Sequence, residues 1–141
     1  MNKFYHGSDE HLPVGTILTA RPDQFTTTWG KNDWCAILER FRPVDMLAQH
    51  DAIFMCDNDE DVDAAGGGTE WVFTVKPLGR VEKHDMNWGT HISMLLCDDP
   101  DNLDAIQKAA INYWNGVPYD VGESLWEYLT PQAEIVAVER F

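Results

Sequence analysis

Close to its N-terminus the chain reads Phe4-Tyr5-His6-Gly7-Ser8, which combines an aromatic pair, one imidazole and one glycine. We expect a strand over residues 3–6, so that the imidazole and the glycine stand where the strand ends. Glycine has no Cβ, and a ligand can therefore approach its main chain closely. A side-chain donor beside such a backbone predicts a binding site for a polar small molecule at this strand end.

Further along the chain, six or seven short strands are interrupted irregularly by helices. This order predicts an α+β fold with a mixed or antiparallel sheet, because a doubly wound fold would alternate strands and helices regularly. Neither a GxGxxG motif nor a P-loop occurs. The further strands are expected within residues 12–18, 52–56, 70–76, 92–97, 126–129 and 133–139, with an extended piece at 80–82, a turn at Pro77-Leu78-Gly79 and a loop at His84-Asp85.

Four helical segments are predicted by apolar spacing and by capping residues. The first begins at Asn32 or Asp33, and a short helical turn follows at residues 44–48. An acidic helix is expected over residues 58–65, stopped by three glycines. The clearest helix begins within Asp98-Asp99-Pro100-Asp101 and ends at Gly116, and the polar stretch 19–31 suits a loop over a site.

Size and composition are typical of a single globular domain over residues 1–141. Hydrophobic residues make up 44% of the 141 residues and include six Trp, which is enough for a core. The 24 Asp and Glu outnumber the 10 Lys and Arg, so the formal net charge is −14 at pH 7. Such a charge disfavours direct binding to nucleic acid or to anionic membranes and favours a basic partner.

The cysteines and the N-terminus favour a cytoplasmic protein. Cys35, Cys56 and Cys97 are odd in number, far apart and without a CxxC pattern, so we expect buried free thiols. No cluster of His and Cys has metal-ligand spacing, and no metal is expected. The first residues lack the apolar region of a signal peptide, and no apolar run is long enough to span a membrane.

Four segments in order carry a resemblance to a known family. They are Phe4-Tyr5-His6-Gly7-Ser8 with Leu12-Pro13-Val14-Gly15-Thr16-Ile17-Leu18, Ala52-Ile53-Phe54-Met55 with Ala64-Ala65, the stretch from Val72 to Val81 that leads to Asp85, and Trp126-Glu127-Tyr128-Leu129. This set resembles small ADP-ribosyltransferases of the diphtheria-toxin-like, His-Tyr-Glu type, and especially the rifamycin-modifying branch. The resemblance spans nearly the whole chain and implies a split mixed or antiparallel sheet with flanking helices.

The resemblance implies that NAD is the substrate. Glu127 would be the carboxylate beside the nicotinamide ribose, where it answers the electron demand of an oxocarbenium-like transition state. His6 would hydrogen-bond a hydroxyl of that ribose, and the backbone of Gly7 would pair with the carboxamide. Phe54 would place an aromatic face against the positively charged pyridinium.

Two departures from the family pattern leave alternatives open. Phe54 stands where the family usually has tyrosine, so part of the stacking could come from Tyr5 or Tyr128. The acid is also ambiguous, because the rifamycin branch points to Asp85 whereas the wider superfamily points to Glu127.

The same residues also have purely structural interpretations. His6 can be a histidine satisfied by the backbone, and Phe54 can simply pack in a core. Glu127 alternates with apolar neighbours and can face solvent on an edge strand. Asp85 can be a turn residue that serves Asn87.

The acceptor of ADP-ribose is expected to be another protein, since the acidic charge favours a basic partner. A small-molecule acceptor is what the closest branch implies, and transfer to water would make the protein an NAD glycohydrolase. The rival hypothesis is a non-catalytic acidic inhibitor that imitates nucleic acid and blocks a basic partner protein.

Overall fold

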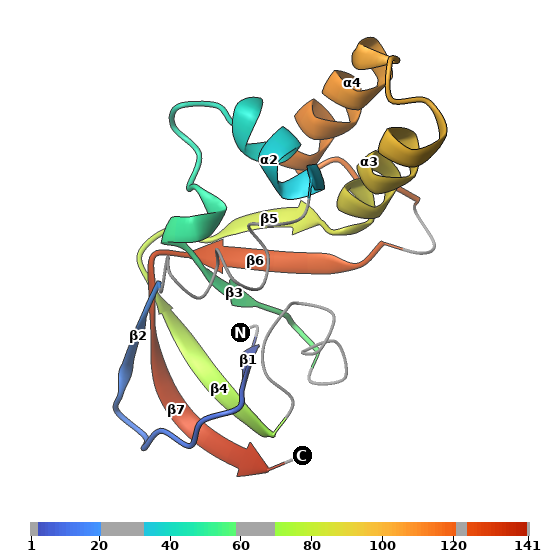
Figure 1. Cartoon of the computed structure of the whole chain (residues 1–141). Coiled ribbons are helices and arrows are strands. Elements are labelled where there is room, and N and C mark those ends of the chain that lie inside the picture. Colours follow the sequence, from blue (N-terminus) through green and yellow to red (C-terminus); the bar gives the residue numbers. More distant parts are fainter. Residues whose placement is uncertain (1–2, 21–32, 59–69, 121–123, 141) are drawn as a thin grey trace. The chain divides into compact units, whose positions relative to one another are not determined.

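The computed structural model describes residues 3–20, 33–58, 70–120 and 124–140 (Figure 1). The chain divides into two compact units. We call Met1–Ala20, Asp51–Lys83 and Glu127–Phe141 the sheet unit, and Arg21–His50 and His84–Trp126 the helical unit. The prediction of a single domain over residues 1–141 stays a prediction, and each unit is described by itself.

Seven strands within the described residues form two antiparallel sheets, which agrees with the predicted α+β class. The larger sheet has the order β1-β4-β7-β2 and the smaller one the order β3-β6-β5. The division between the units falls inside β5, after Lys83. The strands are β1 (Phe4–Ser8), β2 (Ile17–Thr19), β3 (Ile53–Met55), β4 (Trp71–Leu78), β5 (Glu82–Asp85), β6 (Trp126–Thr130) and β7 (Gln132–Arg140).

One face of the larger sheet supplies the core of the sheet unit. Phe73 of β4 has no exposed surface, and Val75 on the same face lies opposite Ile135 of β7, which is also fully buried. The register between β4 and β7 shifts at Thr74/Val75 and leaves Val136 as an extra residue on β7. Such a bulge increases the local twist of the strand and turns Val136 outward, where it is 46% exposed.

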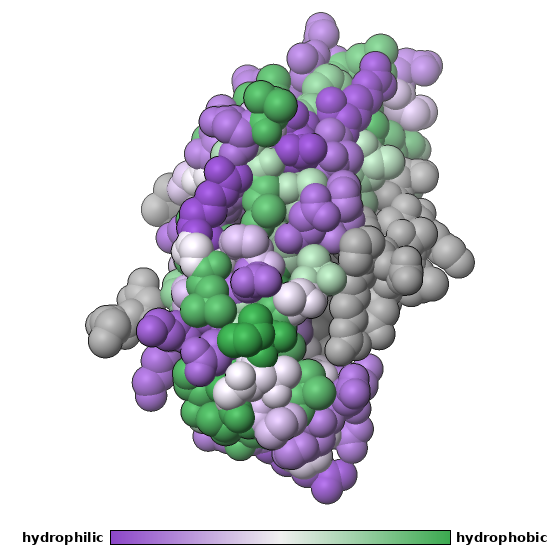
Figure 2. All heavy atoms as spheres, turned by 90° about the vertical axis from the view of Figure 1, so that its left-hand side faces the viewer, coloured by the Kyte–Doolittle hydropathy of each residue, from purple (hydrophilic) through white to green (hydrophobic). Residues whose placement is uncertain are grey.

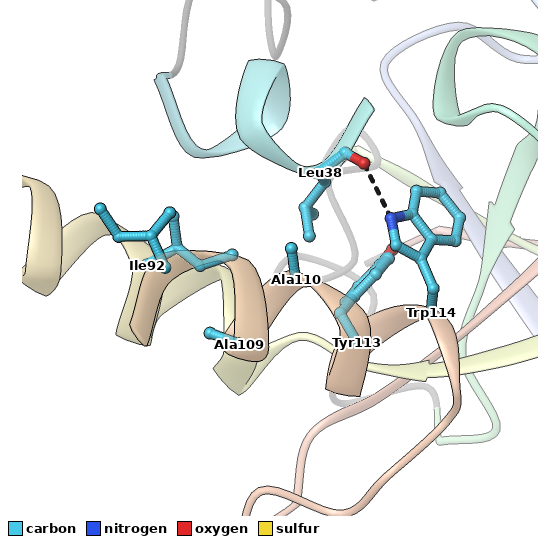
Figure 3. Close-up of a cluster of buried hydrophobic side chains, with 7 residues drawn as sticks. Leu38, Ile92, Ala109, Ala110, Tyr113 and Trp114 are labelled. Carbon is cyan, nitrogen blue, oxygen red and sulfur yellow. Dashed lines mark hydrogen bonds between the residues drawn. The ribbon is translucent and has the colours of Figure 1, made fainter. Parts of the chain in front are cut away.

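The helical unit is built from α2 (Asp33–Arg40), α3 (Asn87–Asp98) and α4 (Leu103–Trp114). Their contacting faces bury one hydrophobic cluster, in which the indole Nε1 of Trp114 donates a hydrogen bond to the carbonyl oxygen of Leu38 (Figure 3). An added Cβ on Gly89 would lie 2.9 Å from the Trp34 ring, so α2 and α3 approach closely only because this residue is glycine. The buried members are Leu38, Ile92, Ile106, Ala109, Ala110, Tyr113 and Trp114.

Most predicted elements are confirmed, including the helix that ends before Gly116. The side chain of Asn102 accepts a hydrogen bond from the backbone amide of Ala105 at the start of α4, and Gly116 follows the helix with a φ of +68°. That left-handed conformation is the one that glycine adopts most readily after a helix. The helix from Asp33, the final two strands and the strands at 17–19, 53–55 and 71–78 also agree with the sequence.

The predicted strand at residues 92–97 is wrong, because this stretch lies within helix α3. The apolar residues Trp88, Ile92, Leu95 and Leu96 are spaced by helical turns and pack on the hydrophobic cluster. The polar positions between them, such as Ser93, are exposed. A short apolar run is compatible with both structures, and packing against α2 and α4 decides for the helix.

Smaller corrections concern the ends of elements. β1 continues through Ser8, so Gly7 lies inside the strand rather than after it. Pro77 and Leu78 end β4 and only Gly79 turns the chain, while His84 and Asp85 belong to β5 rather than to a loop. The helical turn expected at 44–48 occurs later, as the 3₁₀ helix η1 (Gln49–Asp51). The helix expected over 58–65 and most of the 19–31 loop lie outside the described residues.

Several apolar side chains of the sheet unit are exposed on or beside β2 and β7. Val14 is 62% exposed and Ile17 is 45% exposed, and Figure 2, which looks toward β2, shows hydrophobic side chains interspersed with hydrophilic ones on this side.

Within the described residues, no helix has the length and apolar character needed to cross a bilayer.

Candidate functional site

Strands β1 and β3 meet at a single bridge in the sheet unit. The backbone of Tyr5 exchanges two hydrogen bonds with that of Cys56, with N···O distances of 2.8 and 3.0 Å. Backbone groups alternate in direction along a strand. The peptide groups of Tyr5 and Gly7 therefore point toward β3, and those of Phe4, His6 and Ser8 point toward β4.

The imidazole of His6 forms a hydrogen bond with a backbone carbonyl of β3, two residues before Cys56. Its Nδ1 lies 2.7 Å from the carbonyl oxygen of Phe54, and because a carbonyl only accepts, Nδ1 is the donor. The ring also stacks on Phe73, with centroids 6.5 Å apart. The alternative that the backbone satisfies His6 is confirmed by this bond, while its role toward a ligand stays a prediction.

The bond from His6 has a consequence for Gly7. In a continued antiparallel ladder Gly7 would lie opposite Phe54 and would pair with its carbonyl, two positions on from the Tyr5–Cys56 pair. Instead, Tyr5–Cys56 is an isolated bridge, and no second bridge joins Gly7 to β3 within the described part of the chain. Gly7 is nonetheless buried, and buried backbone groups are rarely left without a partner.

The smaller sheet places Glu127 on the same face as Phe54. Phe54 lies opposite Leu129, and Glu127 is two residues from Leu129 on β6. Such diagonal neighbours are about 7–8 Å apart between their Cα atoms. The side chain of Glu127 is only 5% exposed, and β6 is the central strand of its sheet, so the interpretation of Glu127 as a solvent-facing residue on an edge strand is wrong.

Strand alternation divides the predicted site residues between two faces. Tyr5 shares a side with its bridge partner Cys56 and hence with Phe54, two residues earlier, and with Glu127. His6 points to the opposite face of β1 and reaches Phe54 only through the backbone carbonyl. The arrangement thus brings two half-buried aromatic rings and a buried carboxylate to one side of the junction, beside the edge of β1 on which Gly7 lies.

A buried tyrosine occupies the other face of β6. The hydroxyl of Tyr128 donates to Oδ2 of Asp57 at 2.9 Å, and its ring packs edge-on against Phe4 at 5.0 Å. Burial, followed by the hydrogen bond and the negative charge of Asp57, raises the pKa of Tyr128 from 10.0 to about 12. The Lys83 ammonium lies 5.9 Å from the ring centroid. Tyr128 therefore remains a neutral donor, and it faces away from Phe54.

Asp85, the competing acid, lies in the helical unit and organises its backbone. Its Oδ1 accepts from the amides of Asn87 and Leu125 at 3.0 and 3.1 Å, and its Oδ2 accepts from the amide of Tyr119 at 2.9 Å. The side chain is fully buried. The expected hydrogen bond to Asn87 is confirmed, although Asp85 is the last residue of β5 rather than a turn residue, and a catalytic role for Asp85 stays a prediction.

Two features of the junction were missed from sequence. The sequence predicts Cys56 as a buried thiol at the end of a strand, whereas its backbone also forms the bridge to Tyr5. Asp57 follows β3 and was not singled out, although a carboxylate directly after a buried strand is a signal that could have been used. Among the cysteines, Cys35 and Cys56 are buried as expected, but Cys97 is exposed on α3. The described residues contain no group of side chains arranged to hold a metal ion.

Comparison with known proteins leaves the family of this chain open. No protein-family model matches it, and no curated protein matches its sequence significantly.

The Tyr128–Asp57 pair makes the alkaline stability of the protein depend on one proton. Since the pKa of Tyr128 is 10.0 when unfolded and about 12 when folded, the unfolded chain loses the proton first. The stability that Tyr128 contributes is therefore present below pH 10 and is lost as the pH rises toward 12. Tyr128→Phe should flatten this decline in urea unfolding measured across that range, whereas Tyr119→Phe should leave it unchanged. An identical decline in both variants would contradict the assignment.

We expect the Asp85 carboxylate to contribute more to the free energy of unfolding than to catalysis. In Asp85→Asn one oxygen is replaced by an amide nitrogen that cannot accept, so at least one buried backbone amide loses its partner. A hydrogen bond to a charged group contributes about 1.5–3 kcal/mol, and the unfolding free energy should fall by at least that much. Thermal and urea unfolding measure the loss, with the exposed Asp104→Asn as control. An unchanged free energy of unfolding would show that the hydrogen bonds accepted by this carboxylate do not stabilise the fold.

Proposed function

We propose that the protein is an NAD-dependent mono-ADP-ribosyltransferase with an ADP-ribosyltransferase-like split sheet. The observation that carries this proposal is the buried backbone of Gly7, whose peptide groups point to the β3 side of β1 at a position where no bridge to β3 forms among the described residues. A primary carboxamide such as that of nicotinamide has one acceptor oxygen and an NH₂ donor side by side. It can therefore pair with Gly7 as a neighbouring strand would.

The side chains around Gly7 suit the rest of the nicotinamide riboside. Tyr5 and Phe54 supply aromatic faces on one side of the junction, and a positively charged pyridinium is attracted to such faces. That attraction weakens when nicotinamide leaves as a neutral molecule. The missing tyrosine hydroxyl at Phe54 is then not essential, because stacking requires only the ring.

This arrangement favours Glu127 over Asp85 as the carboxylate beside the nicotinamide ribose. In the reaction, the bond between the anomeric carbon and the nicotinamide nitrogen breaks, and its electron pair leaves with nicotinamide. An acceptor nucleophile forms the new bond to that carbon and loses a proton. A fixed carboxylate stabilises the positive charge that develops on the ribose. Glu127 shares a face with Phe54, whereas Asp85 belongs to the helical unit and already accepts three backbone hydrogen bonds.

His6 is a positioning residue in this proposal. Its Nδ1 donates to the Phe54 carbonyl, the acceptor that the Gly7 amide would use in a continued ladder, so the imidazole competes with Gly7 for that acceptor. The ribose contact implied by the family resemblance would have to involve Nε2, since Nδ1 already donates to Phe54. The acceptor is a protein in our proposal, with water or a small molecule as the alternatives that the assay separates.

The test is nicotinamide release from NAD, with and without a cell lysate, by the intact protein and by matched variants. Glu127→Gln should lower kcat by about 100-fold or more, the size of effect seen when one preorganised charge-stabilising group is lost. Glu139→Gln, an exposed carboxylate on β7, should leave kcat unchanged. His6→Ala should weaken NAD binding, because Gly7 and Phe54 are then free to pair.

Replacing Gly7 isolates the backbone contact. Gly7→Pro removes the amide donor, and Gly7→Ala adds a Cβ but keeps the amide. A greater loss of NAD affinity in the Pro variant than in the Ala variant, with both folded, is the expected result. NAD should also raise the melting temperature of the intact protein, because a ligand that binds only the native state stabilises it. No release and no shift at millimolar NAD would overturn the proposal and favour the acidic inhibitor.

A further inference from the structure

Three aromatic side chains cluster on the surface of the helical unit. Trp88 and Tyr119 meet edge to face at 4.9 Å, and His91 lies 5.8 Å from Trp88 and 5.4 Å from Tyr119 between ring centroids. Tyr119 is 41% exposed, and the neighbouring Val117 is 37% exposed. Trp88 and His91 are half-buried, and an exposed Tyr supported by such rings is typical of interaction sites.

Hydrogen bonds within the unit hold this cluster in place. The indole of Trp88 donates to the carbonyl oxygen of Val117 at 2.8 Å, and the hydroxyl of Tyr119 lies 3.1 Å from Nδ1 of His91. The backbone of Tyr119 is tied at 2.9 Å to the buried carboxylate of Asp85. Because the rings are fixed in advance, a ligand that stacks on them loses little affinity to ordering them.

The cluster continues along α3 as a stripe whose first two side chains, Trp88 and His91, are half-buried and whose later ones, Met94 and Asp98, are exposed. Trp88, His91 and Asp98 are separated by three and seven residues and so lie near one face of the helix, with Met94 beside them at 55% exposure. From Trp88 to Asp98 the helix rises about 15 Å. Beyond Asp98 the exposed carboxylates of Asp99 and Asp101 follow. The stripe thus has an aromatic end and an acidic end.

We propose that this stripe, defined by Trp88, His91, Tyr119, Met94 and Asp98, binds an arginine-bearing basic segment of a partner protein. The chain carries a net charge of −14, and the carboxylates at the end of the stripe select a cationic ligand. Arginine fits both ends, because its planar guanidinium stacks on aromatic faces and also pairs with carboxylates. The proposal goes beyond the NAD chemistry and rests on the helical unit alone.

The test is a fluorescence-anisotropy titration of the full chain with two labelled peptides, one alternating Arg and Gly and one alternating Lys and Gly. The Arg peptide should bind more tightly at equal charge, because lysine lacks the stacking plane. Tyr119→Ser should weaken the affinity for the Arg peptide by about two- to fivefold, which is the equivalent of one cation–π contact. Tyr119→Phe should retain most of the affinity, because the ring remains.

Matched surface variants separate a defined site from diffuse attraction. Asp98→Asn should weaken binding more than Glu139→Gln, although each removes one charge, and Val14→Ser should have no effect. Circular dichroism must show that every variant is folded. Equal binding of the two peptides, or equal losses in Asp98→Asn and Glu139→Gln, would overturn the proposal. The titration contains no NAD, so its outcome does not depend on the proposed reaction.

Discussion

The hydrogen bond from Nδ1 of His6 to the carbonyl oxygen of Phe54 is the contact on which the candidate site depends. Without it, β1 and β3 have the register to continue as a ladder past Tyr5 and Cys56. With it, the ladder stops after one bridge, and no second bridge forms at the buried Gly7 within the described part of the chain. A side chain that interrupts a ladder in this way converts a strand edge into a binding edge, since an extended or planar ligand can complete the missing pairing.

A second constraint acts in the helical unit through a buried charge. Asp85 has no exposed surface, and its oxygens accept three backbone hydrogen bonds from segments far apart in the sequence. Burying a carboxylate is costly unless it is well hydrogen-bonded, and here the three amides compensate for that cost. The same carboxylate fixes the segment that carries Tyr119, which links the interior of the unit to its aromatic surface. Glu127 is the contrasting case, a buried acid placed beside aromatic rings on the central strand of a sheet.

Sequence patterns predicted the elements whose local signals agree with their tertiary packing. The helix ending at Gly116 has a cap at Asn102, a consistent apolar face and a terminal glycine, so it could be recognised without the fold. The stretch around Ile92 could not, because its short apolar run suits a strand as well as a helix, and only its packing against α2 and α4 decides. The role of Asp85 had two interpretations for a similar reason. Its amides come from Asn87, Tyr119 and Leu125, and the last two contacts cannot be seen from local sequence. The pairing of His6 with Phe54 likewise depends on β1 and β3 meeting, which the sequence order alone does not reveal.

The most direct test of the account is an NMR titration with NAD that follows the aromatic resonances on the two faces of the junction. Tyr5 and Phe54 lie on the side shared with Glu127, whereas Phe4 and Tyr128 pack together on the other side. We expect NAD to shift the ring resonances of Tyr5 and Phe54, together with the amide of Gly7, and to leave those of Phe4 and Tyr128 nearly unchanged. Shifts confined to Phe4 and Tyr128, or no shift at millimolar NAD, would contradict the account.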